Sequence, residues 1–177
     1  MPFLIGLLGL IAVAYLWMSR VRHAAEMTNE LANMAGDVLA AARRLGFRRR
    51  TNIHPVESIE DTVIGIGALA QAFIELGGLP TEEQQNRLIT SLQAHTGKSL
   101  QEAEETLILG RWIIAQCNGP EPAIDRLLRR LVRLDRTGSF EPLMAVLNDV
   151  AKAGRTGEIS DKQMDALTEI ARQYKVR

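Results

Sequence analysis

Three small residues in one apolar stretch have the spacing of a phosphate-binding loop. Gly65, Gly67 and Ala70 form Gly-x-Gly-x-x-Ala within TVIGIGALAQAF, residues 62–73. In a dinucleotide-binding fold, such glycines end a strand, let the backbone approach a pyrophosphate and start a helix. Taken alone, the motif would indicate a dinucleotide site.

The residues around this motif favour a buried helix instead. The apolar positions recur every three or four residues: Ile59, Val63, Ile66, Ala70 and Phe73. A strand cannot keep that period, and no strand–helix–strand pattern surrounds the glycines as the dinucleotide motif requires. We predict that Gly65 and Gly67 allow close helix packing, although a glycine costs about 1 kcal/mol in a helix interior.

The other reactive residue types form no recognisable catalytic or metal-binding pattern. Gly97-Lys98-Ser99 resembles the end of a P-loop, but Leu92 stands where that motif needs its earlier glycine. The three histidines are scattered and lack the spacing of zinc ligands. Cys117 lies in the apolar stretch LILGRWIIAQC without a basic sequence neighbour, which is typical of a buried structural thiol. We expect no enzymatic activity, no catalytic residue and no cofactor.

The composition indicates that helices position these residues. Of the 177 residues, 46% are hydrophobic but only 5% are aromatic, and the β-branched and aromatic runs that strands prefer are missing. Capping residues divide residues 56–176 into six expected helices. The expected starts are Ser58, Thr81, Ser99, Pro120, Ser139 and Ser160. The third helix is apolar nearly all round from Leu107 to Cys117, so we expect it to be the central one.

The N-terminal stretch predicts a membrane anchor over residues 1–18. Residues 2–18, PFLIGLLGLIAVAYLWM, carry no charge and end with Tyr15 and Trp17, which suit the membrane interface. As a helix they would span about 25 Å, the short end of what crosses a bilayer. A cleaved signal peptide would need positive charge before the apolar run and a small-x-small site after it, and neither is present. Small residues on one side of the span could pack against another membrane helix: Gly6, Gly9 and Ala12.

Residues 19–55 are expected to form a juxtamembrane helix and a basic linker. The segment 24–46 is alanine-rich and amphipathic, and FRRRTNIHP follows it. Because the arginines lie after the apolar stretch, the positive-inside rule places the N-terminus outside and residues 19–177 in the cytoplasm. These arginines either contact anionic lipid headgroups or are merely solvated. They are Arg20, Arg22, Arg43, Arg44, Arg48, Arg49 and Arg50.

The most specific pattern is an internal repeat. GLPTEEQQNRL at 78–88 aligns without gaps to GEISDKQMDAL at 157–167, and both fit Gly-x-x-[Ser/Thr]-acid-x-Gln-x-x-x-Leu. Two capped amphipathic helices could also match by chance. With the preceding LAQAFIEL and NDVAKAGR, the two copies resemble the paired turns of the TerB-like domain, found in tellurite-resistance proteins and in membrane co-chaperones of the DjlA type. This resemblance implies a helical bundle over residues 56–177, behind an N-out anchor in the bacterial inner membrane.

The chain departs from the TerB-like pattern at the acidic positions. Family members usually carry Asp-Gly-x-[Ile/Leu]-Ser-x-x-Glu at each turn, and these acids are the suspected cation ligands. Here the Asp positions hold Gly77 and Thr156, and the Glu positions hold Gln84 and Gln163. Hard divalent cations need several anionic oxygens, so we expect no metal site. We also expect no J domain, since the sequence ends at Arg177 directly after the last helix.

The fourth expected helix carries a row of arginines. The spacing of three and four places them on one face: Arg126, Arg129, Arg133 and Arg136, with Arg130 beside them. This face is either solvated and paired with acids such as Glu102, Glu104 and Glu105, or a docking strip for an acidic protein or lipid. Zero net charge and the lack of an aromatic stacking platform argue against nucleic acid.

Together, these patterns predict a membrane-anchored, cytoplasm-facing helical adaptor or scaffold that contacts lipid and binds protein partners, with a homo-oligomer left open. Two alternatives remain. A metal- or stress-sensing module would need acids outside the repeat turns, and an accessory subunit of a larger inner-membrane complex would use the small residues of the anchor.

Overall fold

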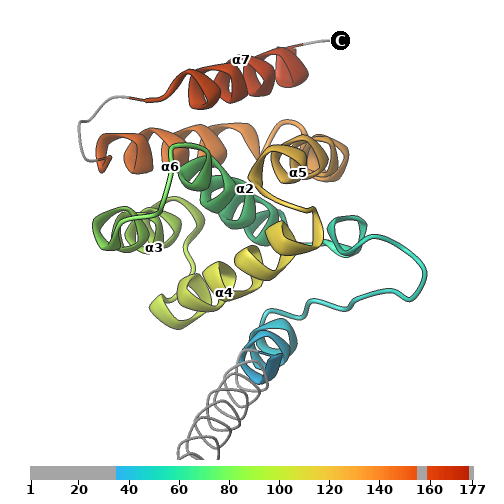
Figure 1. The fold of residues 1–177 in the computed structure, drawn as a ribbon. Helices are drawn as coiled ribbons and strands as arrows, with labels where there is room; N and C mark the ends of the chain where they lie inside the picture. Colours follow the sequence, from blue (N-terminus) through green and yellow to red (C-terminus); the bar gives the residue numbers. More distant parts are fainter. Residues whose placement is uncertain (1–34, 155–158, 176–177) are drawn as a thin grey trace, which may run out of the picture. The chain divides into compact units, whose positions relative to one another are not determined.

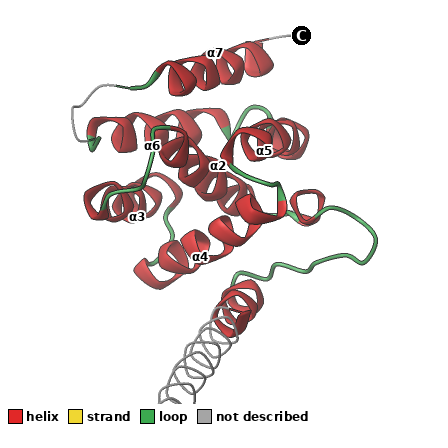
Figure 2. Cartoon of the chain, viewed as in Figure 1, coloured by secondary structure: helices red, strands yellow, loops and turns green. Residues whose placement is uncertain are grey.

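Every regular element in the described part of the chain is helical. A computed structural model describes residues 35–154 and 159–175 (Figure 1), and Figure 2 shows helices and loops but no strand in this part. Residues 35–44 are helical. The following elements are η1 (Pro55–Ser58), α2 (Thr62–Leu76), α3 (Glu82–Thr96), α4 (Leu100–Gln116), α5 (Pro120–Asp135), α6 (Phe140–Lys152) and α7 (Asp161–Lys175). The all-α prediction is confirmed for these residues.

The chain divides into two compact units, Met1–Asp37 and Val38–Arg177. The second unit therefore includes residues 38–55, which the sequence had assigned to the end of the juxtamembrane helix and to the basic linker. None of the helices within 35–154 and 159–175 has the length and apolarity that a bilayer span requires. Several predicted features lie outside the described residues: the anchor at 1–18, Gly6, Gly9, Ala12, Arg20 and Arg22.

Helix α2 is the central helix of the second unit. Its residues 64–74 are all buried, and it packs against α3, α4, α5, α6 and α7 (Figure 1). The expectation that α4 would be central is wrong, because α4 leaves one face in solvent and Ile108 on that face is 37% exposed.

Gly65 and Gly67 let two neighbouring helices approach α2 closely. A Cβ atom on Gly67 would lie 2.3 Å from Cγ2 of Thr106 on α4, and one on Gly65 would lie 2.7 Å from Cδ2 of Leu131 on α5. No ordinary side chain fits at those distances without movement of its neighbour. Residues 62–76 thus form a helix with close contacts, as the apolar period predicted, and not a phosphate loop.

Most helices begin at the predicted capping residues. Thr81 and Ser99 each form a reciprocal capping box at the start of α3 and α4. The first helix begins later than expected, because Ser58 lies at the end of η1 and Asp61 caps α2. There the Oδ1 of Asp61 accepts the backbone N–H of Val63 at 2.8 Å.

Candidate functional site: two arginine clusters around η1

The segment 43–50 begins with a sharp turn that ends the helix of residues 35–44. Gly46 has a left-handed φ of +68° and its N–H donates to the carbonyl of Arg43 at 3.2 Å, while Phe47 N–H donates to the carbonyl of Ala42 at 2.8 Å. These two bonds form a Schellman motif, in which glycine takes the left-handed position without steric cost. The turn brings Phe47 toward α4.

Phe47 and Arg49 hold this segment on Trp112 of α4. The rings of Phe47 and Trp112 meet edge to face, with centroids 6.1 Å apart and planes at 74°. The guanidinium carbon of Arg49 lies 5.8 Å from the centroid of the Trp112 ring. Both geometries are favourable for the ring quadrupole. Residues expected to be a linker are therefore packed on the domain.

Two further arginines of the segment form ion pairs. Arg44 pairs with Glu105 of α4, whose side chain is only 7% exposed. Arg50 pairs with Glu60, and both of those side chains are mostly exposed. The backbone N–H of Arg50 also donates to Oγ of Ser58 at 3.1 Å. These bonds connect the segment to α4 and to the chain that follows η1.

The arginines predicted to contact lipid therefore fall into two groups. Arg44, Arg49 and Arg50 interact with the domain itself. Arg43 and Arg48 are exposed, and neither side chain has an ion pair, hydrogen bond or ring contact within residues 35–154 and 159–175. The sequence could not distinguish these five arginines, because the partners of Arg44, Arg49 and Arg50 are not their neighbours on one helix face.

The α5 arginine row, Arg126, Arg129, Arg130, Arg133 and Arg136, is mostly exposed. The acids that pair with Arg129 and Arg133 lie on α5 and η1 rather than on α4 as expected. An Nη1 of Arg129 is 2.8 Å from Asp125 Oδ2, and Nη2 of Arg133 is 3.2 Å from Glu57 Oε1. Since Arg129 and Arg133 stay 52% and 58% exposed in these pairs, the pairs are weak and exchangeable.

Arg130 differs from the rest of its row. It is half-buried, and its Nε donates to the carbonyl of Ile59 at 2.8 Å while Nη2 donates to the same oxygen. Ile59 is fully buried. A fork of two donors on one buried carbonyl fastens α5 to the start of α2, so Arg130 is a structural residue rather than part of a docking surface.

The two arginine clusters meet at residues 57–60. Arg50 reaches this stretch through Glu60, and Arg133 reaches it through Glu57. Arg130 contacts the residue between those two acids, Ile59. About 80 positions separate the clusters in the chain, and no helical period relates them. Only the fold could bring them together.

Cys117 has basic neighbours that the sequence did not reveal. Its Sγ lies 4.0 Å from Nε2 of His54, and Arg126 is close enough to act on its charge. His54 uses Nδ1 to accept the N–H of Val56 at 3.3 Å, while Nε2 lies 3.1 Å from the carbonyl of Gln116. The Nε2 therefore carries the proton and cannot act as a base toward sulfur. Burial raises the pKa of the Cys117 thiol, against the opposing charge of Arg126, which favours the protonated and less nucleophilic form.

A serine, an aspartate and a histidine form a polar contact between α3 and α6. Asp149 Oδ2 accepts from Oγ of Ser91 at 2.7 Å and faces Nε2 of His95 at 3.1 Å. The hydrogen bonds from Ser91 and His95, with the charge of Arg87, lower the pKa of Asp149. Because the serine bonds the carboxylate and not the imidazole, this is no nucleophilic triad. The contact joins two helices.

The repeat turns lie at the starts of α3 and α7. The backbone N–H groups of Gln84 and Gln163 donate to the hydroxyls of Thr81 and Ser160 at 3.1 and 3.3 Å. Each glutamine side-chain oxygen accepts the N–H of its capping residue in return. Gln163 Nε2 also donates to the carbonyl of Phe73 at 2.9 Å. Both glutamines at the acidic positions of the TerB-like pattern therefore act as helix caps.

The metal prediction is not decided by these contacts. Within the described residues, no three His, Cys, Asp or Glu side chains gather as metal ligands would. Thr156, the second of the replaced Asp positions, lies outside those residues. The absence of a cation site stays a prediction.

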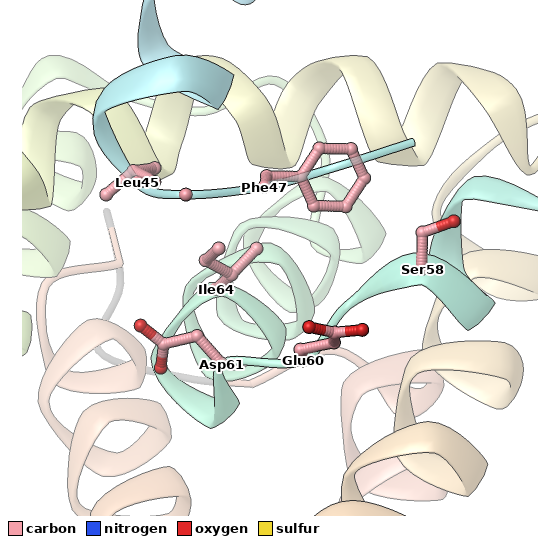
Figure 3. Close-up of a pocket in the computed structure, with 7 residues that line it drawn as sticks. Leu45, Phe47, Ser58, Glu60, Asp61 and Ile64 are labelled. Carbon is pink, nitrogen blue, oxygen red and sulfur yellow. The ribbon is translucent and has the colours of Figure 1, made fainter. Parts of the chain in front are cut away.

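A small pocket lies between the segment 43–50 and the start of α2. Its volume is about 260 Å³, and Figure 3 shows Leu45 and Phe47 on one side and Ile64, Asp61 and Glu60 on the other. The polar groups here are already occupied, since Asp61 caps α2 and Glu60 pairs with Arg50.

Comparisons with known proteins leave the family open. No protein-family model matches this chain, and neither a curated protein nor a solved structure matches it. The TerB-like resemblance of the repeat turns remains a prediction, so a function has to be argued from the residues themselves.

Proposed function

We propose that this chain is a membrane-anchored helical adaptor that docks an acidic protein partner through Arg129 and Arg133, exposed members of the α5 arginine row. The observation that carries the proposal is the exposure of Arg129 and Arg133, whose ion-pair partners Asp125 and Glu57 are themselves 53% and 32% exposed. Such pairs contribute little to folding. A partner's carboxylates can therefore replace Asp125 and Glu57 at small cost.

The rigid mounting of α5 supports a docking role. The opposite face of the helix is buried through Leu127, Leu128 and Leu131, and Arg130 ties it to the carbonyl of Ile59. A helix held in this way presents its exposed arginines without a large loss of conformational freedom on binding. Charged residues on such a face speed encounter and select acidic partners.

The proposed setting follows from the sequence. The uncharged stretch 2–18, followed by arginines, supports a single-pass anchor with the N-terminus outside. The domain would then lie on the cytoplasmic side of a bacterial inner membrane. The two matching capping turns, Thr81 with Gln84 and Ser160 with Gln163, support a TerB-like fold.

The test is a pull-down of the full chain from membranes in mild detergent, with identification of the partners by mass spectrometry. We expect Arg129→Glu/Arg133→Glu to stay folded by circular dichroism but to lose an acidic partner, because like charges across an interface cost several kcal/mol. The matched control is Lys152→Glu/Lys175→Glu, which changes charge equally on α6 and α7 and should keep the partner. Retention of every partner by the folded Arg129→Glu/Arg133→Glu protein would exclude this docking role.

A further inference from the structure

We propose that the segment 43–50 and Trp112 form a face that rests on anionic lipid headgroups, with Arg43 and Arg48 as the phosphate-binding residues. This inference rests on the membrane anchor of the proposed function. It assigns lipid contact to a separate surface from the α5 arginine row.

The five arginines of the segment 43–50 differ in whether the domain itself binds their side chains. Arg44, Arg49 and Arg50 satisfy their charges with Glu105, the Trp112 ring and Glu60. Arg43 and Arg48 are exposed and have no such partner among the described residues. Two exposed guanidinium groups at the two ends of one turn are suited to bind phosphate oxygens.

The face is fixed by a turn and by contacts to Trp112. The Schellman turn at Gly46 fixes the chain between Arg43 and Arg48, and Phe47 and Arg49 hold it on Trp112. Half-buried Trp112 combines an apolar body with an indole N–H, a type of side chain enriched at membrane interfaces.

The predicted anchor favours lipid as the molecule that occupies this face. About 25 residues separate Met18, the end of the uncharged stretch, from Arg43. They span about 40 Å if helical and at most about 85 Å if extended. The proposed anchor would therefore keep this face within about 85 Å of a bilayer, whose cytoplasmic surface carries anionic lipid and attracts arginines at short range. A soluble acidic protein has no such enforced proximity.

The experiment uses the full chain with Trp17→Phe, which leaves Trp112 as the only tryptophan. The protein is incorporated into nanodiscs that contain a dansyl-headgroup lipid, in either phosphatidylglycerol or phosphatidylcholine. Energy transfer from Trp112 to dansyl reports how closely this face approaches the headgroups. We expect strong transfer in phosphatidylglycerol and weak transfer in phosphatidylcholine. The difference should vanish at about 1 M salt, where charges are screened beyond a few ångströms.

Three variants test the assigned residues. Arg43→Ala/Arg48→Ala should lower the docking equilibrium on phosphatidylglycerol about 30-fold, since each arginine near an anionic surface contributes about fivefold. Arg43→Lys/Arg48→Lys keeps the charge and should retain most of the transfer. The control Lys152→Ala/Lys175→Ala removes equal charge on α6 and α7 and should behave as the parent.

The outcomes separate this inference from the proposed function. Equal transfer in both lipids, or transfer unchanged in Arg43→Ala/Arg48→Ala, overturns the lipid face while leaving the anchor intact. Loss of a co-purified protein by that variant, with transfer unchanged, assigns the face to a protein instead. A full chain that stays outside both nanodiscs overturns the anchor and the lipid face together.

Discussion

The arginines of the segment 43–50 and those of the α5 arginine row carry the same charge but differ in how deeply their partners are buried. Arg44 and Arg49 of the segment interact with a buried carboxylate and an aromatic ring. Arg129 and Arg133 of the row form ion pairs that remain more than half exposed on the arginine side. Because burial decides how strongly a charge pair contributes, the number of arginines in a cluster says little about which of them holds the fold together.

Each cluster also contains a member of the opposite kind. Arg130 in the α5 row donates to a buried carbonyl, while Arg43 and Arg48 in the segment are exposed and without described partners. The useful division is therefore between arginines that satisfy a buried group and arginines that face solvent. Binding surfaces should be sought among the second kind.

The largest effect is expected where a buried charge loses its partner. Arg44→Ala leaves Glu105 unpaired in a nearly buried position, and we expect it to lower the free energy of unfolding by about 2 kcal/mol. This is less than for a fully buried pair, because Arg44 is half exposed and Gln101 still donates to Glu105 at 3.1 Å. Urea unfolding followed by circular dichroism of the full chain in mild detergent measures the change. In the Arg44→Ala background, Glu105→Gln should recover stability, because it removes the unpaired buried charge. If Glu105→Gln does not recover the loss, the unpaired charge of Glu105 is not its cause.

A smaller loss is expected for Arg130→Ala, which leaves the carbonyl of Ile59 without its donors. We expect the free energy of unfolding to fall by about 1–2 kcal/mol, because a buried acceptor loses its hydrogen bonds. The loss stays small because water can reach the half-buried position that the arginine side chain leaves. Arg130→Lys should recover part of this, since an ammonium can donate but lacks the planar fork. Arg126→Ala, an exposed member of the same row, is the control and should be near neutral. Equal effects of the two alanine variants in the same unfolding measurement would remove the distinction between them.

The smallest effect is expected for Arg129→Ala, whose ion pair with Asp125 is exposed on both sides. We expect a change of no more than about 0.5 kcal/mol in the free energy of unfolding, and less at high salt. Thermal unfolding at low and high ionic strength measures it. A loss as large as that of Arg44→Ala would show that exposure does not separate the two clusters.

Much of the fold could be predicted because its signals are local. The apolar period through Val63, Ile66 and Ala70 predicted α2, and Thr81 and Ser99 predicted the starts of α3 and α4. Helix periods and capping bonds join residues within one turn of each other. The prediction failed at Ser58, where a short 3-10 helix intervenes before Asp61 caps α2.

The candidate site was less accessible to sequence reasoning. The arginines of both clusters were singled out, but their partners were not, since Arg44 meets Glu105 and Arg133 meets Glu57 across many residues of chain. The expected set of acids for the α5 row lay on α4, whereas the acids that pair with Arg129 and Arg133 are on α5 and η1. Helical spacing predicts on which face of its helix a residue lies. It does not predict which residues of a neighbouring helix pack against that face.

The sequence by itself determined that the described chain is helical, that Gly65 and Gly67 admit close neighbours, and that the repeat turns cap α3 and α7. These properties depend on local hydrogen bonds and on the size of single side chains. Only the tertiary structure decided that α2 rather than α4 is central, that Trp112 holds the segment 43–50, and which arginines remain open to solvent. Those outcomes depend on how helices pack across long stretches of chain, where burial and the register of side chains between helices set the result.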